Sequence, residues 1–500
     1  MTADNVTDFM LTITQVPQSS KRCCSFPCEE NINKSRNAQN QQDAHKILRG
    51  RPMVEKEFFK SALGLINASE AHEQYRGKEC LNLIASEGLK SPAVEEILSQ
   101  THDLESRYAE GENDLRGHVK ARHYQGQKYM TKIENYAADL MKDLFGCNWT
   151  DVRLVSGTHA NLATFKGISS ATKNNRMVVL PLSAGAHITH DYSGLAGKVL
   201  GLETVNHAYD VDELNINAEK SATIIDGTRP GIVTFGGSVF QFPHPVKELA
   251  QVAKDTGAYV VYDAAHVLGL IAGGEFQDPF GDGVDFITAS THKTFPGPQG
   301  GVILANCEDE RMKKAIKKVQ RAVFPMTTSN SHLGRLPALG LAALELKLYG
   351  NELAKQTIKN AQVAGKCLFE NGIKVLGRKN GFTMSHQIVV DVRDYGGGQK
   401  IASNLEDANI VLNKNLLPYD NQHNRGDPSG LRIGFQDVTR RGFKPNDIED
   451  ICSLILEVVK GERTPAEVKK DVIKLRQSFN EIKYGFQSVN EAKEHLKKYA

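Results

Sequence analysis

"AYVVYDAAH" (residues 258–266) joins a run of apolar residues to an aspartate and a histidine. The run is short, β-branched and aromatic, which predicts a buried strand that ends at Asp263, with His266 just beyond it. A carboxylate at the C-terminal edge of a parallel strand faces the ligand crevice of an α/β sheet. The same pattern also fits an aspartate that caps a helix, or half of a metal pair, although no further metal ligand is near in the sequence.

A lysine in an unusual setting follows the next predicted strand. "DFITAS" (residues 285–290) leads into "STHKTFPGPQGG" (residues 290–301), which contains Lys293. Pyridoxal phosphate (PLP) needs such a pair on neighbouring strand ends: the lysine forms a Schiff base, and the aspartate keeps the pyridine nitrogen protonated. The small residues of the turn let backbone approach a phosphate. The sequence therefore predicts a PLP site built on Lys293 and Asp263.

Similar runs recur on both sides of this stretch, separated by helix-length segments. They are "VRLVSG" (152–157), "RMVVLPL" (176–182), "GIVTFGG" (231–237) and "GGVILA" (300–305). This alternation predicts an α/β fold with a large domain whose mostly parallel sheet is sandwiched by helices. A long helix is expected from residue 337. Further runs at 386–392, 408–413 and 430–435 indicate a smaller C-terminal α+β domain, closed by an amphipathic helix that starts with a Thr464–Glu467 capping box.

Composition limits the class of protein. The 500 residues include 61 Lys and Arg against 59 Asp and Glu, so no charge excess points to nucleic acid or an anionic membrane. No apolar run approaches the roughly 20 residues that span a bilayer. Scattered cysteines suit a reducing compartment, and we expect a cytoplasmic protein. The expected divisions are a disordered polar tail (1–50, with Cys23, Cys24 and Cys28 as free thiols), a helical arm (51–100), a large PLP-binding domain (101–345) and a small domain (346–500).

Two more pieces have both a chemical and a plain structural interpretation. Ser156, Gly157 and Thr158 precede a predicted helix, where hydroxyls and free amides make a phosphate cup, or simply cap the helix. Arg432 lies in an apolar strand, where a buried arginine needs an anion; this can be a substrate or a structural salt bridge. "HITH" (187–190) resembles a metal pair, but nothing completes it, so no metal is expected.

With these pieces in place, the chain resembles a serine hydroxymethyltransferase, a PLP enzyme of the aspartate aminotransferase fold (fold type I). The matching motifs run in family order over residues 82–443: "NLIASEG", "RYAEG", "RHYQG", "SGTHAN", "GAHITH", "FGGS", "YDAAHVLGLIAGG", "STHKTFPGPQGG", "AVFP", "NKN" and "SGLRIG" with "TRRGF". The tail before them is not covered by the resemblance.

The resemblance implies a role for each matching residue. Lys293 would carry the Schiff base, Asp263 would pair with the pyridinium, His187 would stack on the ring, and His266 and Ser238 would lie near the phenolic oxygen. Ser156, Gly157, Thr158 and His292 would hold the phosphate, with Gly300 and Gly301 approaching from the other subunit. Arg432 would clamp the substrate carboxylate, assisted by Ser86. Tyr108, Glu110 and Tyr124 would enter from the partner, so a homodimer or higher oligomer is expected.

The implied reaction interconverts serine and glycine and transfers the hydroxymethyl unit to tetrahydrofolate. Glu110 is the residue expected to handle the proton at the hydroxyl or the pterin, because a dry environment can hold a carboxyl neutral. The alternatives are a pterin-independent aldolase acting on threonine-like substrates, an aminotransferase, and a non-catalytic paralogue that acts as a scaffold.

The chain departs from the common family pattern in three places. Gln299 stands where many members have arginine, the segment from Tyr108 to Tyr124 is longer, and "RIGFQD" (432–437) replaces the usual "RIGTPA". The last two could affect the pterin side, so a methanopterin-type carrier is a second possibility beside tetrahydrofolate.

Overall fold

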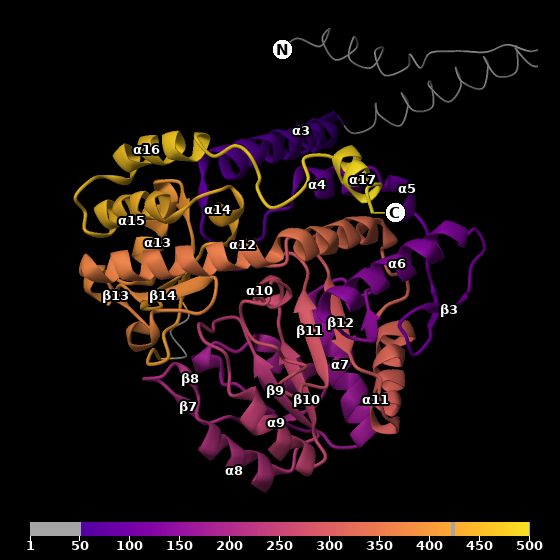
Figure 1. Cartoon of the computed structure of the whole chain (residues 1–500). Coiled ribbons are helices and arrows are strands. Elements are labelled where there is room, and N and C mark those ends of the chain that lie inside the picture. The colour runs from indigo at the N-terminus through magenta and orange to yellow at the C-terminus, as the bar shows by residue number, and fades with distance from the viewer. Residues whose placement is uncertain (1–51, 422–425, 500) are drawn as a thin grey trace, which may run out of the picture. The chain divides into compact units, whose positions relative to one another are not determined.

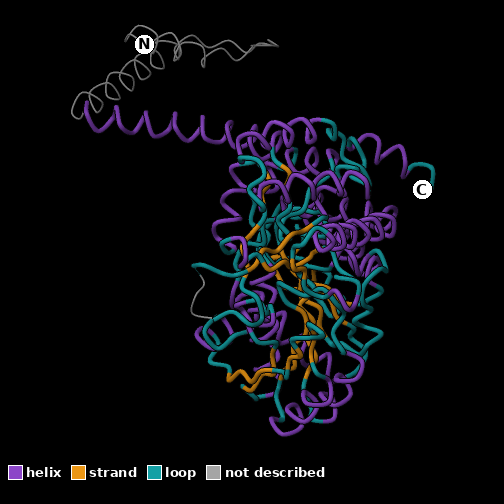
Figure 2. Tube along the Cα trace, turned by 90° about the vertical axis from the view of Figure 1, so that its left-hand side faces the viewer, coloured by secondary structure: helices purple, strands orange, loops and turns teal. Residues whose placement is uncertain are grey.

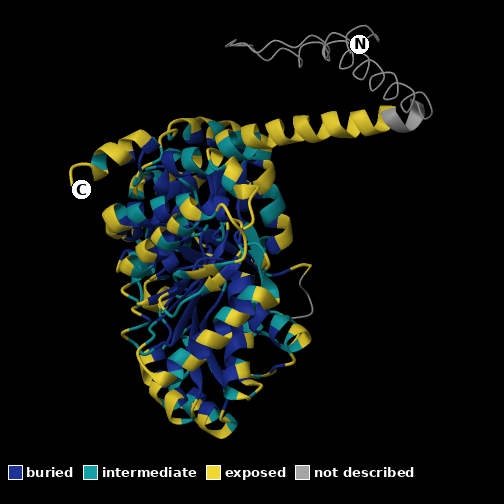
Figure 3. Cartoon of the chain, turned by 90° about the vertical axis from the view of Figure 1, so that its right-hand side faces the viewer, coloured by how far each residue is buried: buried dark blue, intermediate teal, exposed yellow. Residues whose placement is uncertain are grey.

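The computed structural model describes residues 52–421 and 426–499, with side chains from residue 56. The chain divides into two units, Met1–Glu73 and Gln74–Ala500. In the first unit, helix α3 (Pro52–Gln74) is exposed wherever its side chains are described (Figure 3). The predicted tail and its three cysteines lie outside the described residues. Within the described ranges, no helix is long and apolar enough to cross a membrane.

The second unit is organised around a seven-stranded sheet (Figure 1). Its order is β4 (Trp149–Asp151), β12 (Gly301–Ala305), β11 (Phe286–Ser290), β10 (Tyr259–Asp263), β9 (Ile232–Gly236), β5 (Arg176–Val179) and β6 (Glu203–Asn206). The central pairs are parallel, and only β12 runs against its two neighbours. The predicted sheet is confirmed, including the strand that ends at Asp263.

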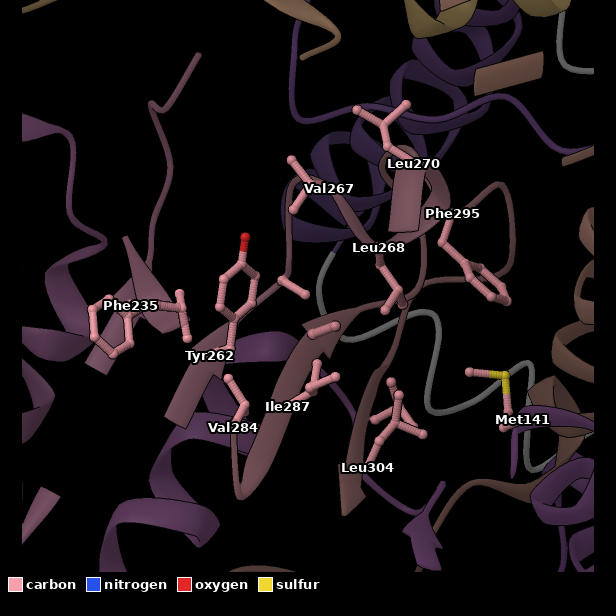
Figure 4. Close-up of a cluster of buried hydrophobic side chains, with 14 of the residues drawn as sticks. Met141, Phe235, Tyr262, Val267, Leu268, Leu270, Val284, Ile287, Phe295 and Leu304 are labelled. Carbon is pink, nitrogen blue, oxygen red and sulfur yellow. The ribbon is translucent and has the colours of Figure 1, made fainter. Parts of the chain in front are cut away.

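Helices cover both faces of this sheet, as the strand side chains require (Figure 2). Along β10, Val260 and Tyr262 face a core shared with α6 (Lys128–Phe145), α8 (Ala218–Thr228), α9 (Val246–Asp255) and α10 (Leu268–Ala272), part of which Figure 4 shows. Tyr259 and Val261 face the opposite core, with α7 (Gly157–Thr172) and α11 (Glu310–Arg321). Strands buried on both faces explain why these runs are apolar throughout rather than alternating.

A 35-residue helix, α12 (Leu336–Glu370), connects the large sheet to a four-stranded antiparallel one. That sheet has the order β13 (Lys374–Val375), β14 (Gln387–Asp391), β17 (Gly430–Gly434) and β16 (Asn413–Asn415). Helices α13 (Gly398–Asp407), α14 (Gln436–Arg440) and α15 (Pro445–Val459) pack with it in one hydrophobic cluster. The predicted C-terminal α+β part is therefore present. The domain limits proposed from the sequence stay predictions. One of them, residue 346, lies inside α12.

Shorter elements complete the unit. They are β1 (Leu81–Asn82) paired with β15 (Ile410–Val411), α4 (Pro92–Ser99), α5 (His102–Glu105), the hairpins β2 (Gly111–Asn113) with β3 (Val119–Arg122) and β7 (Tyr209–Asp210) with β8 (Asn215–Ile216), α16 (Pro465–Gln477) and α17 (Val489–Leu496).

Two expectations on the elements are corrected. The strand expected at residues 152–157 lies earlier, at Trp149–Asp151, because the carbonyl of Val152 bonds the guanidinium of Arg335. The carbonyl of Leu154 accepts from both Arg335 and the backbone N–H of Gly301. The last helix of the chain is α17 and not α16. The predicted capping box at Thr464 and Glu467 is present on α16.

Candidate active site

Asp263 ends strand β10 at the centre of a buried hydrogen-bond network. Its Oδ2 lies 2.9 Å from Nε2 of His190 and accepts a 2.9 Å hydrogen bond from Nδ2 of Asn161, while Oδ1 accepts one from the backbone N–H of Ala265. Burial alone would raise the pKa of Asp263, but His190 and Asn161 stabilise the charge and hold it well below its usual range. Asp263 is therefore a buried carboxylate that stays ionised.

Lys293 follows β11, the strand beside β10. In the described part of the chain its ammonium has neither a carboxylate within 4.0 Å nor a hydrogen-bond acceptor. Burial lowers its pKa to about 8, against the opposing effect of Asp263. Only the neutral form of an amine can attack an aldehyde, and a pKa of about 8 leaves part of Lys293 neutral near physiological pH. The strand order thus brings the two predicted residues to adjacent strand ends.

Four histidines, His187, His190, His266 and His386, lie around this pair. His187 is half-buried, accepts a hydrogen bond from the Thr189 backbone N–H, and lies 6.5 Å from His190 between ring centroids. His266 is buried and stacks on His386 at 5.7 Å. Burial lowers the pKa of His187, and it lowers that of His266 well below the usual value, so both rings are neutral at pH 7. A neutral ring can lie against an aromatic cofactor without adding a second buried charge.

The first turn of α7 approaches the ends of β11 and β12 very closely. A Cβ atom on Gly157 would lie 2.4 Å from Oγ of Ser290, and one on Gly301 would lie 2.2 Å from the carbonyl oxygen of Ser156. Ser156 is the N-cap of α7 and accepts a hydrogen bond from His159 N–H. Glycine is thus needed at both places, and the helix N-terminus that could hold a phosphate lies beside the strand end that precedes Lys293.

The other predicted phosphate residues lie nearby in the chain. Thr158 is exposed on the same helical turn, and His292 adjoins Lys293, with burial lowering the pKa of His292 to about 4. Gly300 packs against Arg335 of its own chain. An approach of Gly300 and Gly301 to a phosphate of the other subunit stays a prediction.

Arg432 extends from β17 toward the large domain. Its Nε donates to Oδ1 of Asn413 (3.0 Å) and its Nη1 to the carbonyl of Ser238 (2.8 Å). The side chain is 9% exposed, and within the described residues it has no carboxylate partner, so the salt-bridge alternative is not what this chain shows. Burial lowers the pKa of Arg432 to about 10. A buried guanidinium without a counter-ion is suited to bind an anionic substrate.

A cavity of about 330 Å³ opens beside Ser238. Its wall combines residues of the large domain, including Leu182, Tyr209 and Val239, with Lys414 of β16 and Leu416 just after that strand. Because Arg432 bonds the carbonyl of Ser238, this cavity lies next to the guanidinium. Its size is that of a small-ligand site.

Tyr108, Glu110 and Tyr124 are not brought to this place within one chain. The rings of Tyr108 and Tyr124 lie 5.3 Å apart and are about half exposed, and the residues between them form the β2–β3 hairpin. Figure 1 shows β3 at the right-hand edge, away from the ends of β10 and β11. Among the described residues, no hydrogen bond or ion pair reaches the Glu110 carboxylate. Their entry into a partner's site stays a prediction.

The residues at the strand ends fit PLP. The lysine is unpartnered, the carboxylate beside it is ionised and buried, and the nearby histidine rings are neutral. Nδ1 atoms of His266 and His292 are buried without a hydrogen-bond partner. Such groups cost free energy unless a ligand or water meets them. Within the described ranges, no group of three or more His, Cys, Asp or Glu could hold a metal ion.

Sequence reasoning missed several residues of the site. His190 is the second histidine of "HITH", and its true partner is Asp263 rather than a metal. Asn161 closes "SGTHAN", and Asn413 opens "NKN", so both belonged to quoted motifs without a role. His386 carried no signal, since a histidine that starts a strand has no distinctive spacing.

Comparisons with known proteins agree with this geometry. The family model for serine hydroxymethyltransferase matches residues 64–455. A serine hydroxymethyltransferase of Saccharolobus islandicus is 42% identical over 88% of this chain and 98% of the relative, and that of Pyrococcus furiosus is 45% identical over 84% and 96%.

A solved structure is also similar. The crystal structure of L-threonine transaldolase from Pseudomonas fluorescens superposes with a TM-score of 0.72 at 25% identity, over 90% of this chain and 96% of that one. The sheet, the site and these relatives give one conclusion: the chain belongs to the serine hydroxymethyltransferase family, whose members are PLP-dependent enzymes of fold type I.

Proposed function

We propose that this chain interconverts serine and glycine by transferring the hydroxymethyl unit to tetrahydrofolate or a related pterin. The observation that carries the proposal is the cavity lined by Ser238, whose carbonyl bonds Arg432, a residue that has no carboxylate partner among the described residues. When the carboxylate of serine is bound at Arg432, this cavity would remain free for a second substrate. Its volume of about 330 Å³ lies in the range of small-ligand sites, which is the size class of a pterin ring.

The residues would act as follows. Arg432 and Ser86 bind the carboxylate, and this orients the amino acid. Lys293 holds the cofactor and, with its pKa lowered to about 8, can take up or release a proton near neutral pH. The ionised Asp263 would pair with the pyridine nitrogen of bound PLP and favour its protonated form. Bound PLP would supply the electron sink for a carbanion at the substrate Cα. Glu110 of a partner subunit would move the proton of the substrate hydroxyl.

An absorbance titration with glycine, with and without tetrahydrofolate, tests the proposal. We expect PLP absorbance that responds to glycine and a long-wavelength band that grows when the pterin is added. A glycine response with no effect of the pterin would contradict transfer to folate. Repeating the titration with a methanopterin-type carrier would then separate a different carrier from no carrier.

A pterin-independent aldolase or transaldolase is the second candidate. It is favoured by one observation, the likeness to an L-threonine transaldolase structure. The discriminating measurement is cleavage of threonine and serine by the purified enzyme. Rapid threonine cleavage without pterin, with serine inert whether or not tetrahydrofolate is added, would support this candidate.

A further inference from the structure

Backbone carbonyls of the loop that carries Ser86 are hydrogen-bonded to the small domain. The carbonyl of Leu83 accepts a 2.8 Å hydrogen bond from Gly434 N–H, and that of Ala85 lies 3.0 Å from Nε2 of His386. The hydroxyl of Ser86 itself has no hydrogen-bond partner in the described part of the chain. Strands of the small domain thus fix the loop and leave its hydroxyl free.

The remaining carbonyls of the loop converge on one side chain, that of Gln436. Its Nε2 donates to the carbonyl of Ile84 (2.7 Å) and to that of Glu87 (2.6 Å), so one amide spans the residues on either side of Ser86. Gln436 is only 6% exposed, which shields both bonds from water. The turn at Ser86 also has a backbone hydrogen bond of its own, from Glu87 N–H to the carbonyl of Ile84 (3.2 Å). The carboxamide of Gln436 therefore reinforces this turn from outside the loop.

This clamp lies near Lys293 and follows Arg432 closely in the chain. Gln436 begins α14, directly after the strand that carries Arg432, and it lines a small cavity together with Lys293. A Cβ atom on Gly434 would lie 2.4 Å from Cα of Ala85. Because residues two apart on a strand point to the same face, Arg432 extends on the face that the Ser86 loop covers.

The same place is where this chain departs from the common family pattern. "RIGFQD" has Gln436 where "RIGTPA" has proline, which has no side-chain N–H to donate. Asp437 adds a second tie, since its Oδ2 accepts a 3.2 Å bond from Nδ2 of Asn82, at the start of the loop. The departure thus creates contacts that proline and alanine cannot make.

We propose that Gln436 is a positioning residue for the substrate carboxylate: it holds Ser86 beside Arg432, so that both side chains bind the same carboxylate. The inference rests on the proposed function, because it needs an amino-acid substrate at Arg432. Gln436 touches neither substrate nor cofactor in this scheme and acts only through the loop.

A double-mutant cycle tests the coupling. Gln436→Leu removes both hydrogen bonds, and the dissociation constant of glycine, read from PLP absorbance, should rise about tenfold. Ser86→Ala should weaken glycine binding by a similar factor, and the double variant should bind glycine no more weakly than Ser86→Ala alone. Gln362→Leu is the matched control, because Gln362 also donates to a loop carbonyl (Thr383, 3.1 Å) but not to one of the Ser86 loop. Independent, multiplying effects of the two substitutions would overturn the proposal.

A second variant guards against simple unfolding. In Gln436→Glu the protonated carboxyl can donate one hydrogen bond, whereas the ionised form repels both carbonyls. Its glycine affinity should therefore recover as the pH is lowered, relative to the parent enzyme at each pH. An affinity ratio that does not change with pH would contradict the clamp, because a purely structural defect has no reason to reverse.

Amide hydrogen exchange without PLP gives a readout independent of activity. The amides of residues 83–88 should exchange faster in Gln436→Leu than in the parent or in Gln362→Leu. Unchanged exchange would overturn the clamp itself. If instead the exchange rises but the parent enzyme does not respond to glycine, the proposed function fails, and the carboxylate role falls with it.

Discussion

Asp263 has three hydrogen-bond partners within its own chain, whereas the carboxylate of Glu110 has none among the described residues. The first lies at the end of a central strand, under a network fixed by α7 and the "HITH" turn. The second precedes an exposed hairpin. The difference teaches that one half of the candidate site is completed by folding, and that the other half needs something further, which we propose is a second subunit.

Lys293→Ala is the change with the largest expected effect. Hydroxymethyl transfer should fall by at least about 10³-fold, because the amine that holds the cofactor is lost. Borohydride reduction followed by peptide mapping should label Lys293 in the parent enzyme and leave the variant unlabelled. Lys317→Ala, an exposed lysine on α11, is the control and should be labelled at Lys293 like the parent. A label on any other residue of the parent would refute the assignment.

Glu110→Gln should lower transfer by about 10²-fold, the usual size of a lost proton-transfer group. PLP binding should be unchanged, because Glu110 lies away from the strand ends in its own chain. Mixing this variant with Lys293→Ala under conditions that exchange subunits tests whether Glu110 acts in the site of a second subunit. If sites are shared, about a quarter of them regain both residues and activity returns. Mixtures as inactive as their components would place Glu110 in its own chain's site, or outside any site.

How far the sequence could predict this molecule follows the same division. The sheet was predictable because buried parallel strands are apolar on both faces, and Lys293 and Asp263 were predictable because they end two of them. The network around Asp263 was not, since His190 and Asn161 come from distant segments and meet only through tertiary packing. Nor was the early end of β4, since the Val152 carbonyl just after it bonds Arg335, a residue far away in the sequence.

The segment from Tyr108 to Tyr124, which is longer than the common family pattern, contains the β2–β3 hairpin. Shortening this hairpin tests whether it serves its own chain's site or a partner's. Replacing residues 112–120 by a two-glycine turn should change the KM for the pterin several-fold and leave glycine binding intact, if the hairpin borders only the mouth of a partner's site. The hairpin is tied to α11 through Gln320, whose Nε2 donates to the carbonyl of Asp114 at 2.7 Å. Gln320→Ala is therefore a milder companion variant. A loss of glycine binding would show that the hairpin supports the site within its own chain.

Acidification should lower the free energy of unfolding, because two buried histidines of the large domain resist protonation in the folded state. Burial lowers the pKa of His207 to about 4 and that of His244 to about 3, whereas an unfolded chain protonates histidine near 6.5. Between pH 6.5 and 4 the unfolded state therefore binds more protons, and the free energy of unfolding should fall by up to about 1.4 kcal/mol per pH unit for each ring.

His244→Asn isolates this effect, which is the smallest of those predicted. The asparagine oxygen can still accept the hydrogen bond that Gly236 N–H gives to Nδ1 of His244 at 3.1 Å, but it does not titrate. Urea unfolding should give the variant a shallower pH slope than the parent below pH 6.5 and the same slope between pH 7 and 8. Equal slopes below pH 6.5 would mean that His244 is protonated in the folded enzyme, and that the core around β9 is less closed to water than its burial indicates.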